Sequence, residues 1–367
     1  MKKAKLFSRG VATLGLTLAL AACGGGDKGG STADSGSTDG GKDTAALTAV
    51  IITDVGGVDD KSFNQSAWEG MQEWGKKHDI PEGVGGYTYI QSGDAADYAT
   101  NIDSGVSQGF QNIFGIGYLL GDSIEAAAGQ NPDTNFTIVD SVIEGADNVA
   151  SATFKDNEAA YLAGYAAAYT TQTDKVGFVG GEEGIVIGRF QAGFEQGVAD
   201  AAEELGKDIS VDVKYAASFA DAAKGKALAA AMYQSGIDVI FHASGATGAG
   251  VFQEAKDLNS MGESDKVWVI GVDSDQSSEG VYTTKDGKED NCVLASTLKG
   301  VGAAVQDICD RALDGKFPGG EHLVYGLTDG GVDLTEGQLS DEAKAAVDGA
   351  KEKVIAGDVE VPEEPAK

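Results

Sequence analysis

Polar side chains stand where predicted strands end, and they decide what chemistry the chain can perform. Asp273 follows the apolar run 269–272 directly, so its carboxylate lies at the mouth of a strand. A carboxylate can accept hydrogen bonds from two neighbouring hydroxyls at once. Lys299 follows a strand predicted to end at Thr297, and its ammonium can donate to the same oxygens and offset the charge of Asp273. These two residues could hold a molecule that carries adjacent hydroxyls.

Aromatic residues follow predicted strands as well. Phe63 and Asn64 open a helix after the first strand, where a ring can stack on a flat group and an amide can offer its edge both a donor and an acceptor. Phe219 lies in the loop after a strand that ends at Tyr215, whereas Phe241 lies within a strand. Because loops at strand ends reach a ligand, we predict Phe219 in the site and Phe241 in the core.

Catalytic patterns are missing from the sequence. The three histidines, His78, His242 and His322, stand in unrelated contexts without H-E-x-x-H spacing. The glycine-rich stretch 245–250 lacks the G-x-G-x-x-G spacing, and no lysine completes a P-loop. We therefore predict a binding protein without catalytic residues, metal or cofactor.

Strands and helices alternate along the chain, and several strands are continuous apolar runs, as expected for parallel strands buried on both faces. The predicted strands are 47–53, 87–91, 112–116, 136–140, 175–180, 211–215, 237–242, 267–272 and 292–297. Predicted helices include 62–77, 157–170, 188–205, 222–235 and 299–313. The rhythm restarts near residue 175, which predicts two doubly wound parallel-sheet lobes with a ligand cleft between them.

Helix ends carry their own signals. Ser62 is predicted to cap the first helix while Gln65 reaches back, and Trp68, Met71 and Trp74 recur on its core face. Asp122 is expected to be another helix cap rather than a ligand contact.

The N-terminus is typical of an exported lipoprotein. Residues 1–22 combine a basic start with an apolar run too short to span a bilayer, as in a signal peptide. Small residues precede Cys23, as in a bacterial lipobox, which predicts lipidation of that cysteine and an extracytoplasmic location at the cell membrane. Residues 23–46 contain the cysteine and then only small and polar residues, so they are predicted to be a flexible linker.

Charge and cysteine content narrow the partners further. The formal net charge of −31 over 367 residues repels phosphate backbones and anionic lipid surfaces, which argues against nucleic-acid binding. Cys292 and Cys309 match no zinc-binding spacing. The sequences around them are typical of a strand and a helix that face a core, so both are predicted to be buried thiols. We expect a monomer.

Longer stretches of the sequence resemble the basic membrane protein family, whose characterised members are lipoproteins that bind purine nucleosides for ABC importers. The resemblance covers essentially all of the chain beyond the linker and is carried by the stretches 53–65, 177–181, 189–194, 218–219, 241–245, 271–273, 296–300 and 355–362. It implies a type I periplasmic-binding fold in which two lobes joined by a hinge close on a nucleoside. It also implies delivery of that nucleoside to an ABC permease.

The resemblance also implies roles for individual residues. Asp140, which ends the strand 136–140, should accept hydrogen bonds from the edge of the base, and Asp273 and Lys299 should hold the ribose. Asp54 and Gly245 are predicted ligand contacts on opposite sides of the cleft.

The predicted N-terminal lobe comprises 47–155 plus about 300–326, and the C-terminal lobe 156–299 plus about 327–362. The departures from the family pattern, the acidic surface and Gly121–Asp122, leave purine and pyrimidine both open. A binding protein for a sugar or another small polar solute remains an alternative, as does a ligand-sensing lipoprotein without a transporter.

Overall fold

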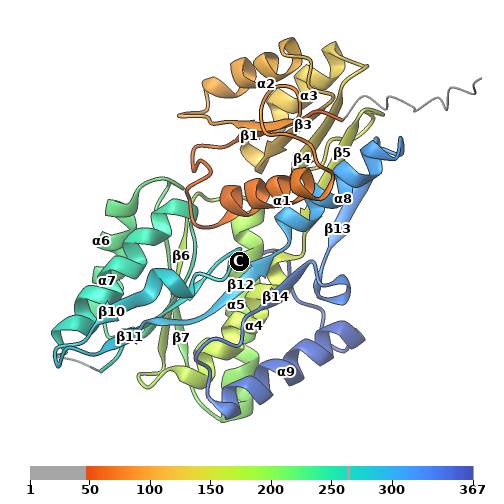
Figure 1. Cartoon of the computed structure of the whole chain (residues 1–367). Coiled ribbons are helices and arrows are strands. Elements are labelled where there is room, and N and C mark those ends of the chain that lie inside the picture. Colours follow the sequence, from red (N-terminus) through yellow and green to blue (C-terminus); the bar gives the residue numbers. More distant parts are fainter. Residues whose placement is uncertain (1–46, 263–264, 367) are drawn as a thin grey trace, which may run out of the picture. The chain divides into compact units, whose positions relative to one another are not determined.

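The computed structural model describes residues 47–262 and 265–366, which hold two six-stranded sheets (Figure 1). The predicted signal peptide, Cys23 and the linker 24–46 lie outside the described residues. In the first sheet every neighbouring pair of strands is parallel. Its strands, in spatial order, are β13 (His322–Tyr325), β5 (Val149–Phe154), β4 (Asn135–Val139), β3 (Asn112–Ile116), β1 (Ala49–Thr53) and β2 (Tyr87–Ile90).

The second sheet repeats this order with one change at its edge, where β14 pairs antiparallel with β12. Its strands are β14 (Val332–Leu334), β12 (Val293–Lys299), β9 (Trp268–Gly271), β8 (Val239–Ala243), β6 (Lys175–Gly180) and β7 (Ser210–Tyr215). Each sheet therefore draws an edge strand from the end of the chain, β13 for the first and β14 for the second. The chain runs from one sheet to the other after β5, after β12 and after β13.

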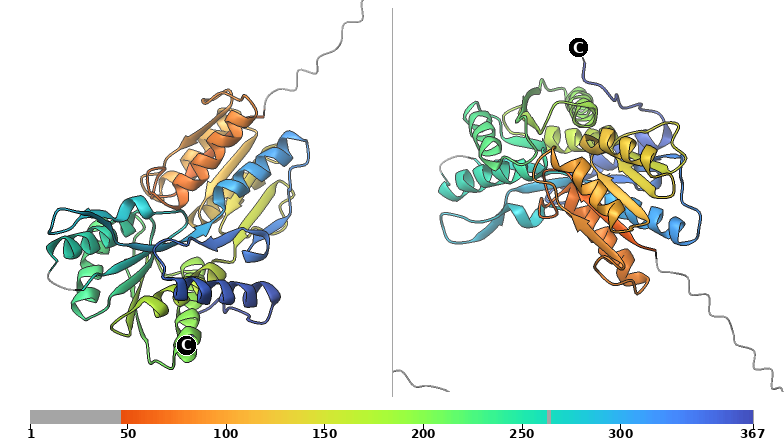
Figure 2. Two further views of the ribbon diagram at one scale, coloured as in Figure 1. Left: turned by 60° about the horizontal axis from the view of Figure 1, so that its bottom comes forward. Right: turned by 90° about the horizontal axis from the view of Figure 1, so that it is seen from above.

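Helices cover both faces of the first sheet because alternate residues of its strands point to opposite sides. Ile51 of β1 belongs to the same core cluster as residues of α1 (Phe63–Lys77) and α8 (Val301–Leu313), which lie side by side (Figure 2). Ile52 packs in a separate cluster with residues of α2 (Asp97–Ser107) and α3 (Gly121–Gln130).

The second sheet is covered in the same manner. Phe178 of β6 joins the cluster that contains residues of α4 (Asp156–Thr170), α5 (Ile185–Leu205) and α9 (Asp341–Ala356). Val179 packs instead with residues of α6 (Ala222–Gln234) and α7 (Gly248–Met261). Close packing of α4 on α5 requires glycine, since a Cβ on Gly197 would lie 2.1 Å from the carbonyl oxygen of Tyr161.

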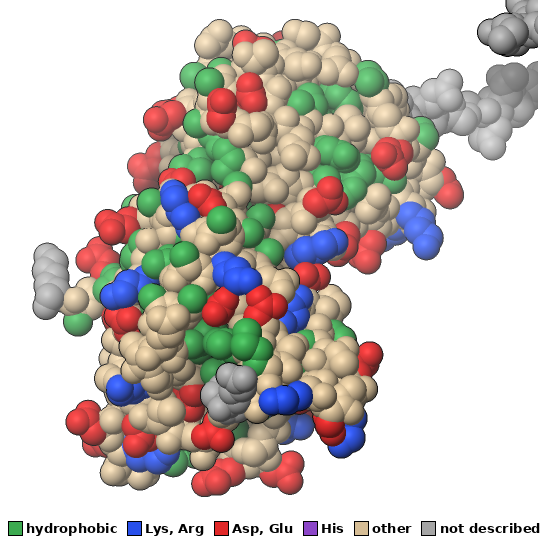
Figure 3. Space-filling model, turned by 90° about the vertical axis from the view of Figure 1, so that its left-hand side faces the viewer, with side chains coloured by type: hydrophobic (Ala, Val, Ile, Leu, Met, Phe, Trp, Pro, Cys, Tyr) green, Lys and Arg blue, Asp and Glu red, His purple; other side chains and the backbone are tan. Residues whose placement is uncertain are grey.

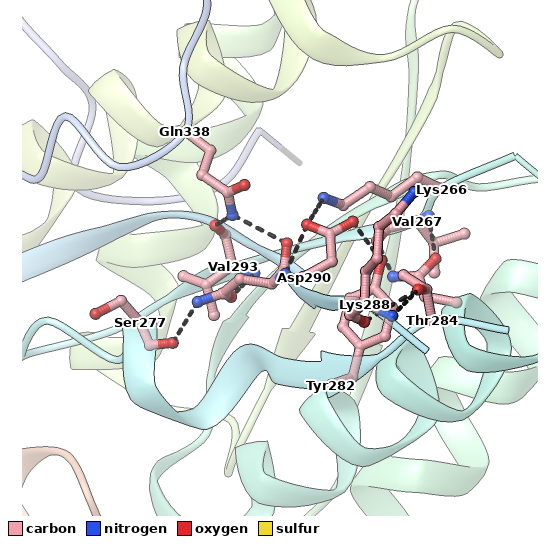
Figure 4. Close-up of polar contacts among 11 residues, drawn as sticks. Lys266, Val267, Ser277, Tyr282, Thr284, Lys288, Asp290, Val293 and Gln338 are labelled. Atoms are coloured by element: carbon pink, nitrogen blue, oxygen red, sulfur yellow. Dashed lines mark hydrogen bonds and ion pairs between the residues drawn. The ribbon is translucent and has the colours of Figure 1, made fainter. Parts of the chain in front are cut away.

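A short hairpin follows β9 and carries a dense polar network (Figure 4). It consists of β10 (Val281–Thr283) and β11 (Glu289–Asn291), which pair antiparallel. Asp290 accepts hydrogen bonds from the Lys266 ammonium at 2.8 Å and the Tyr282 hydroxyl at 2.9 Å. The Gln338 amide donates to the carbonyl oxygen of Val293 at 2.7 Å, which ties the start of β12 to the segment before α9.

The structure confirms the predicted strands and helices, with ends shifted by up to three residues. Cys292 and Cys309 are buried free thiols, as expected. Strand β5 was not predicted, because its sequence VASATF mixes small and polar residues and does not look like a buried strand. Every one of its residues is nevertheless buried.

Ser62 occupies the N-cap position of α1, as predicted, but the predicted capping box does not form, and the prediction that Asp122 is a cap is wrong. The Ser62 side chain makes no cap bond, because the Asp60 carboxylate accepts the backbone N–H groups of Ser62, Asn64 and Gln65 at 2.9, 2.9 and 3.1 Å. Asp122 lies inside the first turn of α3, whose N-terminal flanking residue is Leu120 without a side-chain cap.

The surface carries many carboxylates, in line with the net charge of the sequence. Figure 3 shows one face, on which Asp and Glu side chains are spread widely with Lys and Arg between them. Within the described residues, no helix has the length and apolar character needed to cross a membrane.

Candidate binding site

A cavity lies at the carboxyl ends of strands from both sheets, where ligands of doubly wound sheets bind. It encloses about 540 Å³ of space between atoms, part of it open to solvent. All eight predicted ligand contacts line it: Asp54, Phe63, Asn64, Asp140, Phe219, Gly245, Asp273 and Lys299.

The first wall of the cavity comes from the turn between β1 and α1. The Asn64 amide nitrogen donates to Asp54 Oδ1 at 2.8 Å and to Asp60 Oδ2 at 2.9 Å. Burial raises the pKa of Asp54 to about 6, although the Gly56 N–H and the Asn64 amide favour its charged form. A Cβ on Gly56 would lie 2.9 Å from the Asn64 amide nitrogen, so glycine leaves room for this cluster.

Lys299 holds the centre of the site. Its ammonium lies 2.7 Å from Asp140 Oδ2 and 3.0 Å from Asp156 Oδ1, and all three side chains are buried. The ammonium also lies 5.1 Å from the ring centroids of Phe63 and Phe154. Burial alone would lower the pKa of Lys299, but the carboxylates around it outweigh burial and raise that pKa, so the side chain is a cation.

Carboxylates outnumber this cation. Asp54, Asp60, Asp140 and Asp273 all line the cavity and are all buried. Burial raises the pKa of Asp273 to about 6, with Lys299 and Ser62 acting in the opposite direction. Even so, no group of three or more acidic, histidine or cysteine side chains in the described chain is arranged to hold a metal ion.

Residues of the turn before α1 also contact residues after β9. The Ser62 hydroxyl donates to Asp273 Oδ2. The carbonyl oxygen of Lys61 accepts from the Gln276 amide at 2.8 Å and from the Ser274 hydroxyl at 3.1 Å. These bonds join the segments that follow β1 of the first sheet and β9 of the second.

Asp140 and Asp273 occupy equivalent places, since each follows the strand that is third from the edge of its sheet, β4 or β9. Both adopt left-handed backbone angles, with φ of 66° and 67°. Asp tolerates this region better than most side chains. The repeated conformation turns both carboxylates toward the cavity, and Asp140 Oδ1 is buried there without a hydrogen-bond partner.

Aromatic side chains complete the lining. Phe63 lies in α1, and Phe219 lies in the loop after β7. The Phe219 ring lies so close to Gly181 that it would meet a Cβ there. The Tyr118 ring lies edge-on to Phe219, with centroids 6.4 Å apart. Phe241 is fully buried against Phe178 in the core, as predicted.

Sequence reasoning missed further lining residues, of which Asp60, Tyr118 and Phe190 have the largest or most polar side chains. Asp59 and Asp60 are neighbouring acids in the turn before α1, but only Asp59 is exposed. The signal that could have found Asp60 is its position two residues before the helix cap. The complete set of missed residues is Gly56, Asp60, Gly117, Tyr118, Val186, Ile187, Phe190, Ala243, Ser244 and Val272.

Comparison with known proteins places this site in context. A family model described as ABC transporter substrate-binding protein, PnrA-like, matches residues 47–365. The chain belongs to this family. Within it, the chain is 54% identical to the ABC transporter nucleoside-binding protein BmpA of Lactococcus lactis subsp. cremoris, over 88% of this chain and 91% of that protein.

Other relatives extend the comparison. The chain is 49% identical to the CD4+ T-cell-stimulating antigen of Listeria monocytogenes, over 88% of this chain and 90% of the relative. A crystal structure of ABC transporter system solute-binding proteins from Aeropyrum pernix K1 superposes with a TM-score of 0.76 at 24% identity, covering 87% of this chain and 94% of the other. The predicted type I periplasmic-binding fold and the resemblance to the basic membrane protein family are both confirmed. The protein is a substrate-binding component of the ABC transporter type.

Proposed function

We propose that the protein captures nucleosides, with purine nucleosides as the expected class, in the cavity between the two sheets. The observation that carries this proposal is the lining of the cavity. It combines an aromatic ring that follows a strand of each sheet, Phe63 and Phe219, with buried carboxylates. The nucleoside-binding name of a relative at 54% identity supports the same ligand class.

The electrostatics of the cavity favour an uncharged ligand rich in hydrogen-bond donors. Four lining carboxylates face one lysine, so a phosphate would meet net negative charge in a buried site. Hydroxyls of a ribose and N–H groups of a base are donors that carboxylates accept. The proposal therefore includes nucleosides and excludes nucleotides.

We propose that binding closes a hinge between two lobes, 47–155 with about 300–326 and 156–299 with about 327–362. A ligand that touches both lobes only when they are closed stabilises that state. The bonds of Ser62 with Asp273 and of Gln276 with the Lys61 carbonyl would be made in the closed state. Identical small-angle scattering profiles with and without a tightly bound nucleoside would contradict closure.

The first experiment is a thermal-shift screen of the purified protein against nucleosides, nucleotides, free bases and pentoses. A ligand at a hundred times its dissociation constant stabilises the native state by about 2.7 kcal/mol, so a true ligand should be evident. We expect stabilisation by nucleosides and none by the matching nucleotides. Stabilisation by pentoses alone, or by none of the compounds, would refute the nucleoside assignment.

We further propose that the protein is lipidated at Cys23, is held at the extracytoplasmic face of the cell membrane, and delivers its ligand to a permease. The support is the lipobox-like sequence and the family assignment. A Cys23→Ala variant should lose acylation, which mass spectrometry of the N-terminal peptide measures. Nucleoside uptake by cells that carry this variant should fall, while binding by the purified variant should not change.

A further inference from the structure

Asn64 presents only one kind of hydrogen-bonding group to the cavity. The distances show that its amide nitrogen is shared by two carboxylates, Asp54 Oδ1 at 2.8 Å and Asp60 Oδ2 at 2.9 Å. An amide has two N–H donors, and both are used by these contacts. The reverse orientation would set the amide oxygen against two carboxylates, which repel it. The amide is therefore fixed with its oxygen on the remaining side.

That oxygen has no partner. Asn64 Oδ1 is buried, makes no hydrogen bond to the described residues, and belongs to a side chain that lines the cavity. A buried acceptor without a partner costs free energy, so in a native binding site it points to a donor that arrives with the ligand. The expectation that Asn64 offers both a donor and an acceptor is thus corrected to an acceptor alone.

Asp60 itself is held rigidly. Its two oxygens accept three backbone N–H groups at the start of α1, and Asp60 is buried. These bonds fix the carboxylate against the helix that carries Asn64, so the orientation of the amide is built into the helix start. The neighbouring Asp59 is exposed and provides a matched control.

We propose that Asp60, with Asp54, is a positioning residue that locks the Asn64 amide as an acceptor, so that the site selects nucleosides whose base carries an N–H donor. This inference rests on the proposed nucleoside function and names the part of the ligand that the site reads. A purine without any N–H on its ring system would leave Asn64 Oδ1 unpaired and bind more weakly.

The test is calorimetric titration of the full purified protein with inosine, adenosine and purine riboside, the last of which has the same sugar but no N–H on its base. We expect purine riboside to bind about 5- to 150-fold more weakly than the better of the other two, the loss typical of an unpaired buried acceptor. Asp60→Asn removes one of the two carboxylates that fix the Asn64 amide, so the orientation with its nitrogen toward the ligand becomes less unfavourable. This ratio should then fall at least about threefold, while Asp59→Asn should keep it.

The outcomes separate the two proposals. If purine riboside bound as tightly as the better of inosine and adenosine, the selection of N–H donors would be overturned while the nucleoside function would stand, and this result does not depend on any variant. An unchanged ratio in a folded Asp60→Asn variant, verified by its melting curve, would overturn the positioning role of Asp60. Failure of all three nucleosides to bind would overturn both proposals.

Discussion

The hairpin network around Asp290 and the cavity network around Asp273 are built from the same side-chain types but satisfy them differently. Asp290 accepts hydrogen bonds from Lys266, Tyr282 and the N–H of Asn291. Burial would raise its pKa, but these donors outweigh burial and lower it. In the cavity, burial raises the pKa of Asp273 to about 6.

The difference separates a structural polar network from a binding one. Most buried polar groups that only support a fold are paired, because an unpaired group costs about 1–3 kcal/mol. The cavity keeps acceptors such as Asn64 Oδ1 and Asp140 Oδ1 without partners. Such groups lower the stability of the empty protein and become useful only when a donor arrives.

Of the variants that test this difference, Lys299→Met should change the free energy of unfolding the most. Removing the ammonium leaves the carboxylates of Asp140, Asp156 and Asp273 buried without their counter-ion. Breaking a buried ion pair in this way costs about 3–5 kcal/mol, which urea unfolding at pH 7 would measure.

The control is Lys266→Met in the hairpin network, where the lysine and Asp290 are partly exposed. That variant should lose no more than about 1 kcal/mol. Equal losses of stability in the two lysine variants would show that the cavity carboxylates depend on Lys299 no more than Asp290 depends on Lys266.

Asp273→Asn, in contrast, should raise the stability of the empty protein. Its folded-state pKa of about 6 lies above the ordinary value of 3.8, so its contribution to stability is full below 3.8 and is lost as pH rises through 6. At pH 8 the empty variant should therefore be more stable than the wild type, by up to about 3 kcal/mol for a two-unit shift. The variant should also bind nucleosides at least about tenfold more weakly, because a charged acceptor is lost.

Unfolding curves from pH 5 to pH 8 check this prediction. The stability difference between Asp273→Asn and the wild type should shrink as pH falls, because the wild-type carboxyl becomes protonated. A variant that is less stable than the wild type at pH 8, or a difference that does not vary with pH, would contradict the electrostatic account of the cavity.

The sequence was sufficient for the repeated α/β pattern and for the side chains that follow strand ends. Asp54, Asp140 and Asp273 were found because parallel strands bring their carboxyl ends to one edge, whatever the details of packing. Lys299 was found for the same reason, but its partner was expected to be Asp273, whereas its nearest carboxylates are Asp140 and Asp156.

Contacts between distant segments could not be predicted. Asp156 begins α4, and nothing in its local sequence indicates an ion pair with Lys299. Asp60 was missed because local sequence does not separate a solvated turn acid from a buried one. The Ser62 side chain makes no cap bond because Asp60 accepts the backbone N–H groups, and the Ser62 hydroxyl donates to Asp273 instead.

The smallest effect is expected for Asp290→Asn, which sharpens the comparison from the structural side. The lowered pKa of Asp290 means that its charge stabilises the fold above the ordinary value near 3.8 and that this contribution is lost as pH falls through its folded-state value. At pH 7 the variant should lose up to about 1 kcal/mol, as for a partly exposed ion pair with hydrogen bonds. The deficit should fade in acid, the reverse of the trend for Asp273→Asn, and nucleoside affinity measured by calorimetry should stay within about twofold of wild type, since ΔΔG values of distant sites combine independently. A loss of affinity as large as that of Asp273→Asn would mean that the hairpin network serves the ligand as well as the fold, and the distinction between the two networks would fail.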